Sequence, residues 1–177
     1  MKGLVITILI LTLVASLAFA DGAPRGGEFG IQGNLSLPFT GTIGSPNGSV
    51  GGKYFFTDTI ALRAALGFAS SSAGGTSTLG YDLAAGFEYH LNGKNGVSPY
   101  VGAEMSYSGY SISTGGSTDS DFGLRGVFGA EYYFSNSFSW GGELGLGLDS
   151  AYSALSKTTT TTVGTVAFRT TLTWYLN

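Results

Sequence analysis

Apolar residues alternate with small or ionisable residues, without interruption, from Leu79 to Leu91. One phase contains only apolar or aromatic side chains: Leu79, Tyr81, Leu83, Ala85, Phe87, Tyr89 and Leu91. The other phase mixes glycine and alanine with Asp82, Glu88 and His90. Because successive side chains of a β-strand point to opposite faces, one face is a wall of apolar groups and the other holds every charge. Apolar residues outward and polar residues inward are typical of a barrel wall in lipid.

Seven further segments repeat this alternation, and most reach the roughly 9 to 11 residues that a tilted strand needs to cross a bilayer. They cover residues 29–39, 50–56, 60–68, 101–107, 122–134, 138–148 and 166–176. Three connections between segments are short and turn-forming, at residues 57–59, 92–96 and 135–137. The other four, at residues 40–49, 70–78, 111–120 and 150–162, are longer and rich in Ser, Thr and Gly. Short turns at one end and long loops at the other predict an all-β fold: an eight-stranded antiparallel up-and-down transmembrane β-barrel.

The first twenty residues predict a cleaved export signal. Lys2 gives a basic start, residues 4–17 an apolar run, and Ala18-Phe19-Ala20 a small-x-small cleavage site. A retained membrane helix is the alternative, but the run lacks a basic flank after it. We therefore expect a signal peptide over residues 1–20 and one barrel domain over residues 21–177. The chain has no cysteine, so neither a disulfide nor a lipoprotein anchor is available.

Composition further limits the classes of structure and of binding partner that are possible for this chain. Thirty glycines, many aromatic residues and few charges argue against helices and against disorder. Acidic residues outnumber Lys and Arg by 11 to 8, and no basic patch is present. We therefore expect no nucleic-acid partner.

Aromatic residues gather beside the short connections and predict a girdle at one membrane interface. The expected interface residues are Tyr54, Phe56, Tyr89, Tyr132, Phe134, Phe138, Trp140 and Trp174. The same girdle is expected to include Phe55, Tyr100, Tyr133 and Tyr175. A sparser second girdle could use Phe39, Phe68, Tyr81, Tyr107, Phe122 and Tyr152.

The inward phase carries most of the ionisable side chains: Glu28, Lys53, Arg63, Asp82, Glu88, His90, Glu104, Arg125, Glu131, Glu143 and Arg169. An eight-stranded barrel is only wide enough for side chains, so these charges must pair across it or meet trapped water. Six of them lie at similar distances from the short turns, where Arg and Glu could bond in bidentate fashion: Arg63, Glu88, Glu104, Glu131, Glu143 and Arg169. We interpret the set as a packed ion-pair plug, with an ion path or a catalytic site as alternatives.

No residue pattern predicts catalysis, a cofactor or a metal. His90 is the only histidine, and Glu88 shares its face two residues away, but no second His or Cys can complete a typical transition-metal site. Serine is abundant enough for Ser-His-Glu hydrolysis, yet no motif singles out a nucleophile.

The chain resembles the small eight-stranded outer-membrane barrels, which include the outer-membrane protein A transmembrane domain, the X-type barrels and the opacity-type proteins. The resemblance spans approximately residues 27–177 and rests on residues 54–63, 98–103, 122–126, 129–132 and the last strand. Family barrels usually end in an aromatic residue, whereas here Leu176 and Asn177 follow Trp174 and Tyr175. The His-x-Ser pair of lipid A deacylases is absent, since Leu91 and Asn92 follow His90.

The leading hypothesis is therefore a non-enzymatic barrel of a Gram-negative-type outer membrane, with extracellular loops, periplasmic termini and a structural or adhesion-type role. Expected partners are the membrane lipids, the barrel-assembly machinery and periplasmic chaperones during biogenesis, and an unidentified extracellular ligand. Three alternatives are a narrow pore or transporter for small solutes or ions, a lipid-modifying enzyme, and a soluble lipocalin-like barrel with its strands turned inside out.

Overall fold

The computed structural model describes residues 26–38, 48–73, 75–91, 96–112 and 118–176, without the side chains at 36–38, 73, 112, 118 and 165–167. The predicted signal peptide lies outside these residues. So do Phe39, most of the predicted loop at 40–49, and most of the predicted turn at 92–96. The described part of the chain contains no helix long and apolar enough to cross a membrane.

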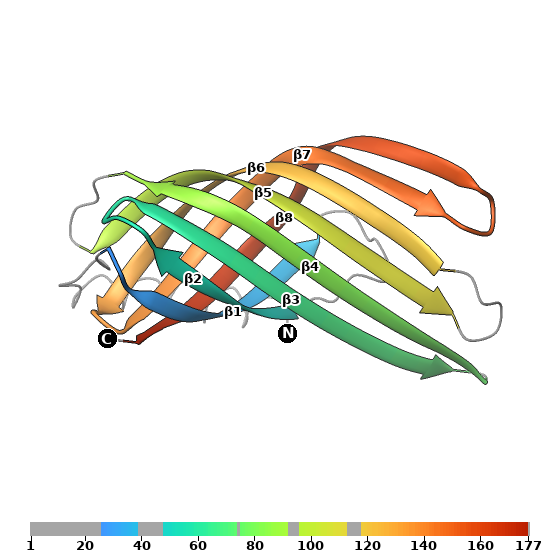
Figure 1. Cartoon of the computed structure of the whole chain (residues 1–177), viewed down its shortest axis with the longest axis horizontal. Coiled ribbons are helices and arrows are strands. Elements are labelled where there is room, and N and C mark those ends of the chain that lie inside the picture. The colour runs from blue at the N-terminus through green and yellow to red at the C-terminus, as the bar shows by residue number, and fades with distance from the viewer. Residues whose placement is uncertain (1–25, 39–47, 74, 92–95, 113–117, 177) are drawn as a thin grey trace, which may run out of the picture.

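Eight antiparallel strands close into one barrel, in which each strand pairs with its neighbour in sequence and β8 pairs with β1 (Figure 1). The predicted fold class is therefore confirmed. The strands are β1 (Phe29–Pro38), β2 (Gly48–Phe55), β3 (Ile60–Ala73), β4 (Thr76–His90), β5 (Val97–Ile112), β6 (Thr118–Ser135), β7 (Phe138–Ser153) and β8 (Thr158–Leu176).

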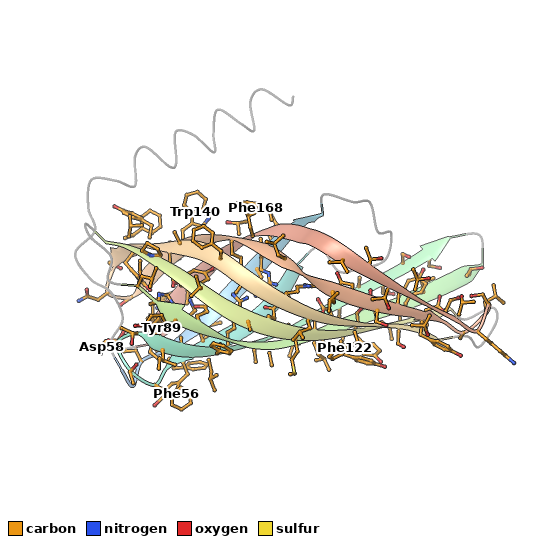
Figure 2. All side chains as sticks on the ribbon, turned by 90° about the horizontal axis from the view of Figure 1, so that it is seen from above. Phe56, Asp58, Tyr89, Phe122, Trp140 and Phe168 are labelled. Atoms are coloured by element: carbon orange, nitrogen blue, oxygen red, sulfur yellow. The ribbon has the colours of Figure 1, made fainter. Side chains whose placement is uncertain are left out.

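The barrel is apolar outside and polar inside, as the alternation predicts. Leu62 pairs with Phe87 and Val101 with Phe128 across neighbouring strands, and all four side chains are exposed. Figure 2 shows Phe56, Phe122, Trp140 and Phe168 on the outer side of the ribbon. Fully buried side chains include Lys53, Glu88 and Glu131, on the opposite phase of their strands. The buried interior is thus largely a set of polar groups that must satisfy one another.

Tight turns connect neighbouring strands at one end of the barrel. In the β2–β3 turn, the hydroxyl of Thr57 accepts hydrogen bonds from the backbone N–H groups of Thr59 and Ile60. Only Asn136 and Ser137 separate β6 from β7. The N–H of Tyr175 donates to the carbonyl of Ser137, which ties the end of β8 to this turn. We call this end of the barrel the short-turn end.

At the opposite end, the described residues differ from the prediction for two of the four long loops, at 70–78 and 150–162. β3 and β4 continue through most of residues 70–78, and the hydroxyls of Ser71 and Thr78 lie 2.6 Å apart across the ladder. Gly75 supplies the positive φ of 82° that this tight turn requires. Likewise, β7 and β8 pair as far as Ser153 and Thr158. Serine and threonine fit a ladder whose two faces are both wet, so these segments form projecting hairpins rather than loops (Figure 1).

Candidate functional site

Arg63 on β3 lies at the centre of the barrel interior and contacts three glutamates from three other strands. Its Nη1 donates to Glu88 Oε1 at 2.8 Å and to Glu143 Oε2 at 2.5 Å. Its Nη2 donates to Glu104 Oε2 at 2.8 Å and to Glu143 Oε1 at 3.1 Å. The guanidinium therefore forms a bidentate pair with Glu143 and links β3 to β4, β5 and β7. Only a planar group with several donors can do this.

Arg169 on β8 forms the second bidentate pair. Its Nη1 and Nη2 donate to the two carboxylate oxygens of Glu104 at 2.8 and 2.5 Å, and its Nε lies 3.2 Å from Glu143 Oε1. Arg125 lies beyond it, 3.1 Å from Asp149 and 3.7 Å from Glu104. The side chains of Arg125 and Asp149 are partly exposed, so the ion pairs are more accessible to water toward the projecting hairpins.

Lys53 and Glu131 extend the ion pairs toward the short-turn end. The Lys53 Nζ lies 2.6 Å from Glu88 Oε2 and 2.8 Å from Glu131 Oε2. Both oxygens of Glu131 also accept hydrogen bonds from hydroxyls, which come from Ser139, Tyr133 and Tyr175. Glu131 is 1% exposed, and its full set of donors is what a buried carboxylate needs.

These groups form one connected set, which we call the lumenal cluster. Its members are Lys53, Arg63, Glu88, His90, Glu104, Arg125, Glu131, Glu143, Asp149 and Arg169. They come from every strand except β1. The cluster therefore crosses the full width of the interior and ties distant strands together.

Four aromatic side chains line the interior next to the cluster, at the short-turn end. Phe55, Tyr100, Tyr133 and Tyr175 are each no more than 2% exposed. The sequence prediction that these four join the outer girdle is therefore wrong. Strand alternation explains their inward position, because each of the four residues directly follows or precedes a residue that faces outward. We call them the aromatic layer; Tyr100 reaches past it and donates to Glu143 Oε2 at 2.8 Å.

Gly129 makes room for Tyr100. A Cβ at this position would lie 2.6 Å from Tyr100 Cζ and 2.7 Å from the carbonyl oxygen of Gly142. We expect Gly129→Ala to lower the free energy of unfolding by about 1–3 kcal/mol, because the added methyl overpacks the interior. Gly33→Ala is the matched control, since a Cβ there meets nothing within 4 Å. Urea titrations of both variants test this, and equal stabilities would contradict the close packing of Tyr100.

His90 joins Ser98 to Glu88 in a chain that resembles a hydrolytic triad. Its Nδ1 lies 2.9 Å from Ser98 Oγ, and its Nε2 lies 2.9 Å from Glu88 Oε2. Ser98 is 7% exposed, and Phe55 and Tyr100 flank the imidazole at centroid distances of 5.0 and 5.1 Å. A nucleophile needs an approachable oxygen and free donors for an oxyanion. This burial is better suited to holding the ring in place than to attacking a substrate.

Glu88, His90 and Glu131 also come close enough for their ligand atoms to surround a metal ion. The ammonium of Lys53 lies between the two carboxylates, at hydrogen-bond distance from each. A second cation there would face a buried positive charge at close range. The chain's own lysine thus provides the positive charge that these carboxylates require.

The structure brings together nine of the eleven ionisable residues assigned to the interior. Glu28 precedes β1, is half-buried and has no ion pair within the described residues. Asp82 faces the interior nearer the projecting hairpins and is likewise unpaired among the described side chains. The prediction missed Asp149, which pairs with Arg125, although the alternation of β7 places it inward.

Seven of the eight expected interface aromatics are exposed or half-buried on the outside of the barrel: Tyr54, Phe56, Tyr89, Phe134, Phe138, Trp140 and Trp174. Tyr132 shares their face but is 8% exposed, with its ring edge-on to Phe134 at 5.1 Å. Packing against the ring of Phe134 contributes to the burial of Tyr132, which sequence alternation does not reveal. In the expected second girdle, Phe68, Tyr107 and Phe122 are exposed on the outer face.

Comparison with known proteins identifies the family. The sequence matches the outer membrane protein beta-barrel domain over residues 6–174. None of the curated proteins matches it significantly.

Solved structures show the same fold. The outer membrane protein OprG from Pseudomonas aeruginosa has a TM-score of 0.56 and 14% identity, covering 89% of this chain and 100% of that one. The outer membrane protein AlkL in lipid bilayers has a TM-score of 0.57 and 13% identity, covering 89% and 93%. Neisserial surface protein A has a TM-score of 0.52 and 18% identity, covering 83% and 97%. The chain belongs to the outer membrane protein beta-barrel family and lies in the outer membrane with its apolar face against lipid.

Proposed function

We propose that this protein is a closed barrel that acts through its extracellular end, in a structural or adhesion-type role. The observation that carries the proposal is the lumenal cluster, which spans the interior from β2 to β8. A closed interior leaves the outer surface and the projecting hairpins as the parts available for interaction.

Burial of the lumenal cluster supports a closed interior. Arg63, Glu88, Glu104 and Glu143 are each at most 6% exposed, so water has little access to the ion pairs at the centre. A passing ion would have to break several charge-assisted hydrogen bonds at once. The aromatic layer adds a second obstruction, because its rings fill the space next to the cluster on the periplasmic side.

The extracellular hairpins support a role in surface interaction. β7 and β8 remain paired beyond the last large apolar pair, Leu148 and Val163, and end in a turn with Leu155 88% exposed. Strand pairing makes such a hairpin more rigid than an irregular loop of the same length. A rigid projection loses less conformational entropy when it binds a partner.

We further propose that the protein is not an enzyme and that it matures with the help of periplasmic chaperones and the barrel-assembly machinery. The predicted signal peptide and the membrane barrel support this route. The buried position of Ser98 supports the absence of hydrolytic activity.

Vesicle swelling tests the proposal against the alternative of a solute pore. Folded protein, verified by its heat-dependent gel mobility, is reconstituted into vesicles and diluted into isotonic arabinose or glycine. We expect the swelling rate of protein-free vesicles, because the lumenal cluster blocks the interior. Vesicles with a general porin serve as the positive control. Rapid swelling in either solute would overturn the closed-barrel proposal.

A further inference from the structure

The ammonium of Lys53 lies among three side chains that are suited to bind a divalent metal ion. One ligand atom each from Glu88, His90 and Glu131 lies within 4.8 Å of the other two, and the Lys53 Nζ contacts both carboxylates at 2.6 and 2.8 Å. Two atoms bound to the same zinc ion lie at most about 4.2 Å apart, which is twice a Zn–O length of about 2.1 Å. The three side chains therefore need to approach one another by no more than about 0.6 Å to bind one ion.

The hydrogen bonds that surround these three side chains are those of a metal centre. A histidine that binds a metal through one ring nitrogen donates a hydrogen bond from the other, and the ligating carboxylates accept further hydrogen bonds. The Nε2 of His90 lies 2.9 Å from Glu88, and its Nδ1 lies 2.9 Å from Ser98 Oγ. Arg63 donates to the second oxygen of Glu88, and three hydroxyls donate to Glu131. The groups that orient metal ligands are thus already in place.

The centre of the lumenal cluster is short of one positive charge. Four carboxylates face three cations there: Glu88, Glu104, Glu131 and Glu143 against Lys53, Arg63 and Arg169. Arg125 and Asp149 balance each other at the partly exposed edge. A divalent ion in place of the ammonium would bring the balance to four against four, with His90 counted as neutral. Because an uncompensated buried charge is costly, this position favours a doubly charged occupant.

We propose that Glu88, His90 and Glu131 form a zinc site in which the ammonium of Lys53 takes the place of the metal ion. Imidazole and carboxylate are both ordinary zinc ligands, and here two carboxylates supply what a second His or Cys would otherwise provide. The lysine is attached to β2, so folding itself delivers its positive charge to the site. Removal of the ammonium together with its aliphatic stem opens the site to zinc, with water as the fourth ligand.

Three variants separate a metal site from a general loss of charge. K53A removes both the charge and the side chain that fills the site. K53M removes the charge but keeps an unbranched side chain in the same space. K53A/H90Q opens the space and also removes the nitrogen ligand. Each protein is folded without an affinity tag in detergent micelles, with and without zinc chloride, and heat-dependent gel mobility reports folding.

Metal content and cobalt absorption measure the binding. We expect folded K53A to retain one zinc ion per barrel after gel filtration, and its cobalt form to show the visible absorption bands of a four-coordinate site. K53A/H90Q should bind zinc at least about 100-fold more weakly, because loss of even an outer hydrogen-bond partner costs up to that factor. The wild type and K53M should retain no more zinc than micelles without protein.

Wild-type protein that binds zinc as tightly as K53A would overturn the proposal, because the ammonium would then not hold the position of the metal. Folded K53A that binds no zinc would also overturn it, as would K53A that fails to fold both with and without zinc. Unchanged zinc binding in K53A/H90Q would place the ion at other residues and equally contradict the proposal.

Discussion

Replacing Arg63 with leucine is expected to destabilise the barrel by about 3–5 kcal/mol. The loss follows from the three carboxylates that Arg63 contacts, Glu88, Glu104 and Glu143, because the leucine leaves them buried with too few positive partners. Arg63→Lys should lose less, since it keeps the charge but cannot form a bidentate pair with Glu143. Urea-dependent unfolding in lipid vesicles, followed by tryptophan fluorescence and gel mobility, gives the free energies.

Lys157→Leu is the control for the loss of a positive charge. Lys157 is exposed in the β7–β8 turn, so its replacement should change stability by no more than about 0.5 kcal/mol. Arg169→Leu should fall between Arg63→Leu and this control, because Arg169 contacts two glutamates and is somewhat more exposed. Equal unfolding midpoints for all three leucine variants would refute a structural role for the lumenal cluster.

Removing both central arginines is expected to open a path for cations. In the R63A/R169A variant, two large side chains leave the interior, and Glu104 and Glu143 lose their bidentate partners. Unpaired carboxylates draw in water and favour cations over anions. Planar-bilayer recordings should therefore show cation-selective current steps in the variant. R125A serves as the control, because Arg125 lies at the partly exposed edge of the lumenal cluster rather than at its buried centre.

An R63A/R169A variant that folds, as judged by gel mobility, and shows no current would contradict this expectation. The aromatic layer would then be sufficient to close the barrel without the two arginines. Current that favours anions would also contradict it, because the remaining carboxylates set the sign of the selectivity.

The barrel could be predicted from the sequence because its signal is local and repeated. The alternation from Leu79 to Leu91 fixes which face meets lipid, and the three short turns fix the order and direction of the strands. The projecting hairpins could not be predicted in the same way. Serine and threonine suit loops as well as wet strands, so residues 70–78 and 150–162 gave no local sign that the ladders continue.

The sequence predicts which residues belong to the candidate site but not which of them contact one another. Alternation places Arg63, Glu104 and Glu143 inside, yet which carboxylate each guanidinium meets depends on how the barrel closes across its width. Their position beside the short turns predicts that Tyr100, Tyr133 and Tyr175 belong to the outer girdle. Strict alternation would have placed all three inside, since each directly neighbours an outward residue. Proximity to a turn proved a weaker guide than strand phase.

The conductance of the wild-type protein in a planar bilayer tests the central claim most directly. The measurement uses the folded protein without the predicted signal peptide, at several voltages and in symmetric potassium chloride. A lumen closed by the cluster around Arg63 and by the aromatic layer predicts a bilayer current no different from that of the bare membrane. Stable current steps in the wild type that Arg63→Leu or Arg169→Leu abolishes would contradict the closed barrel and establish a pore.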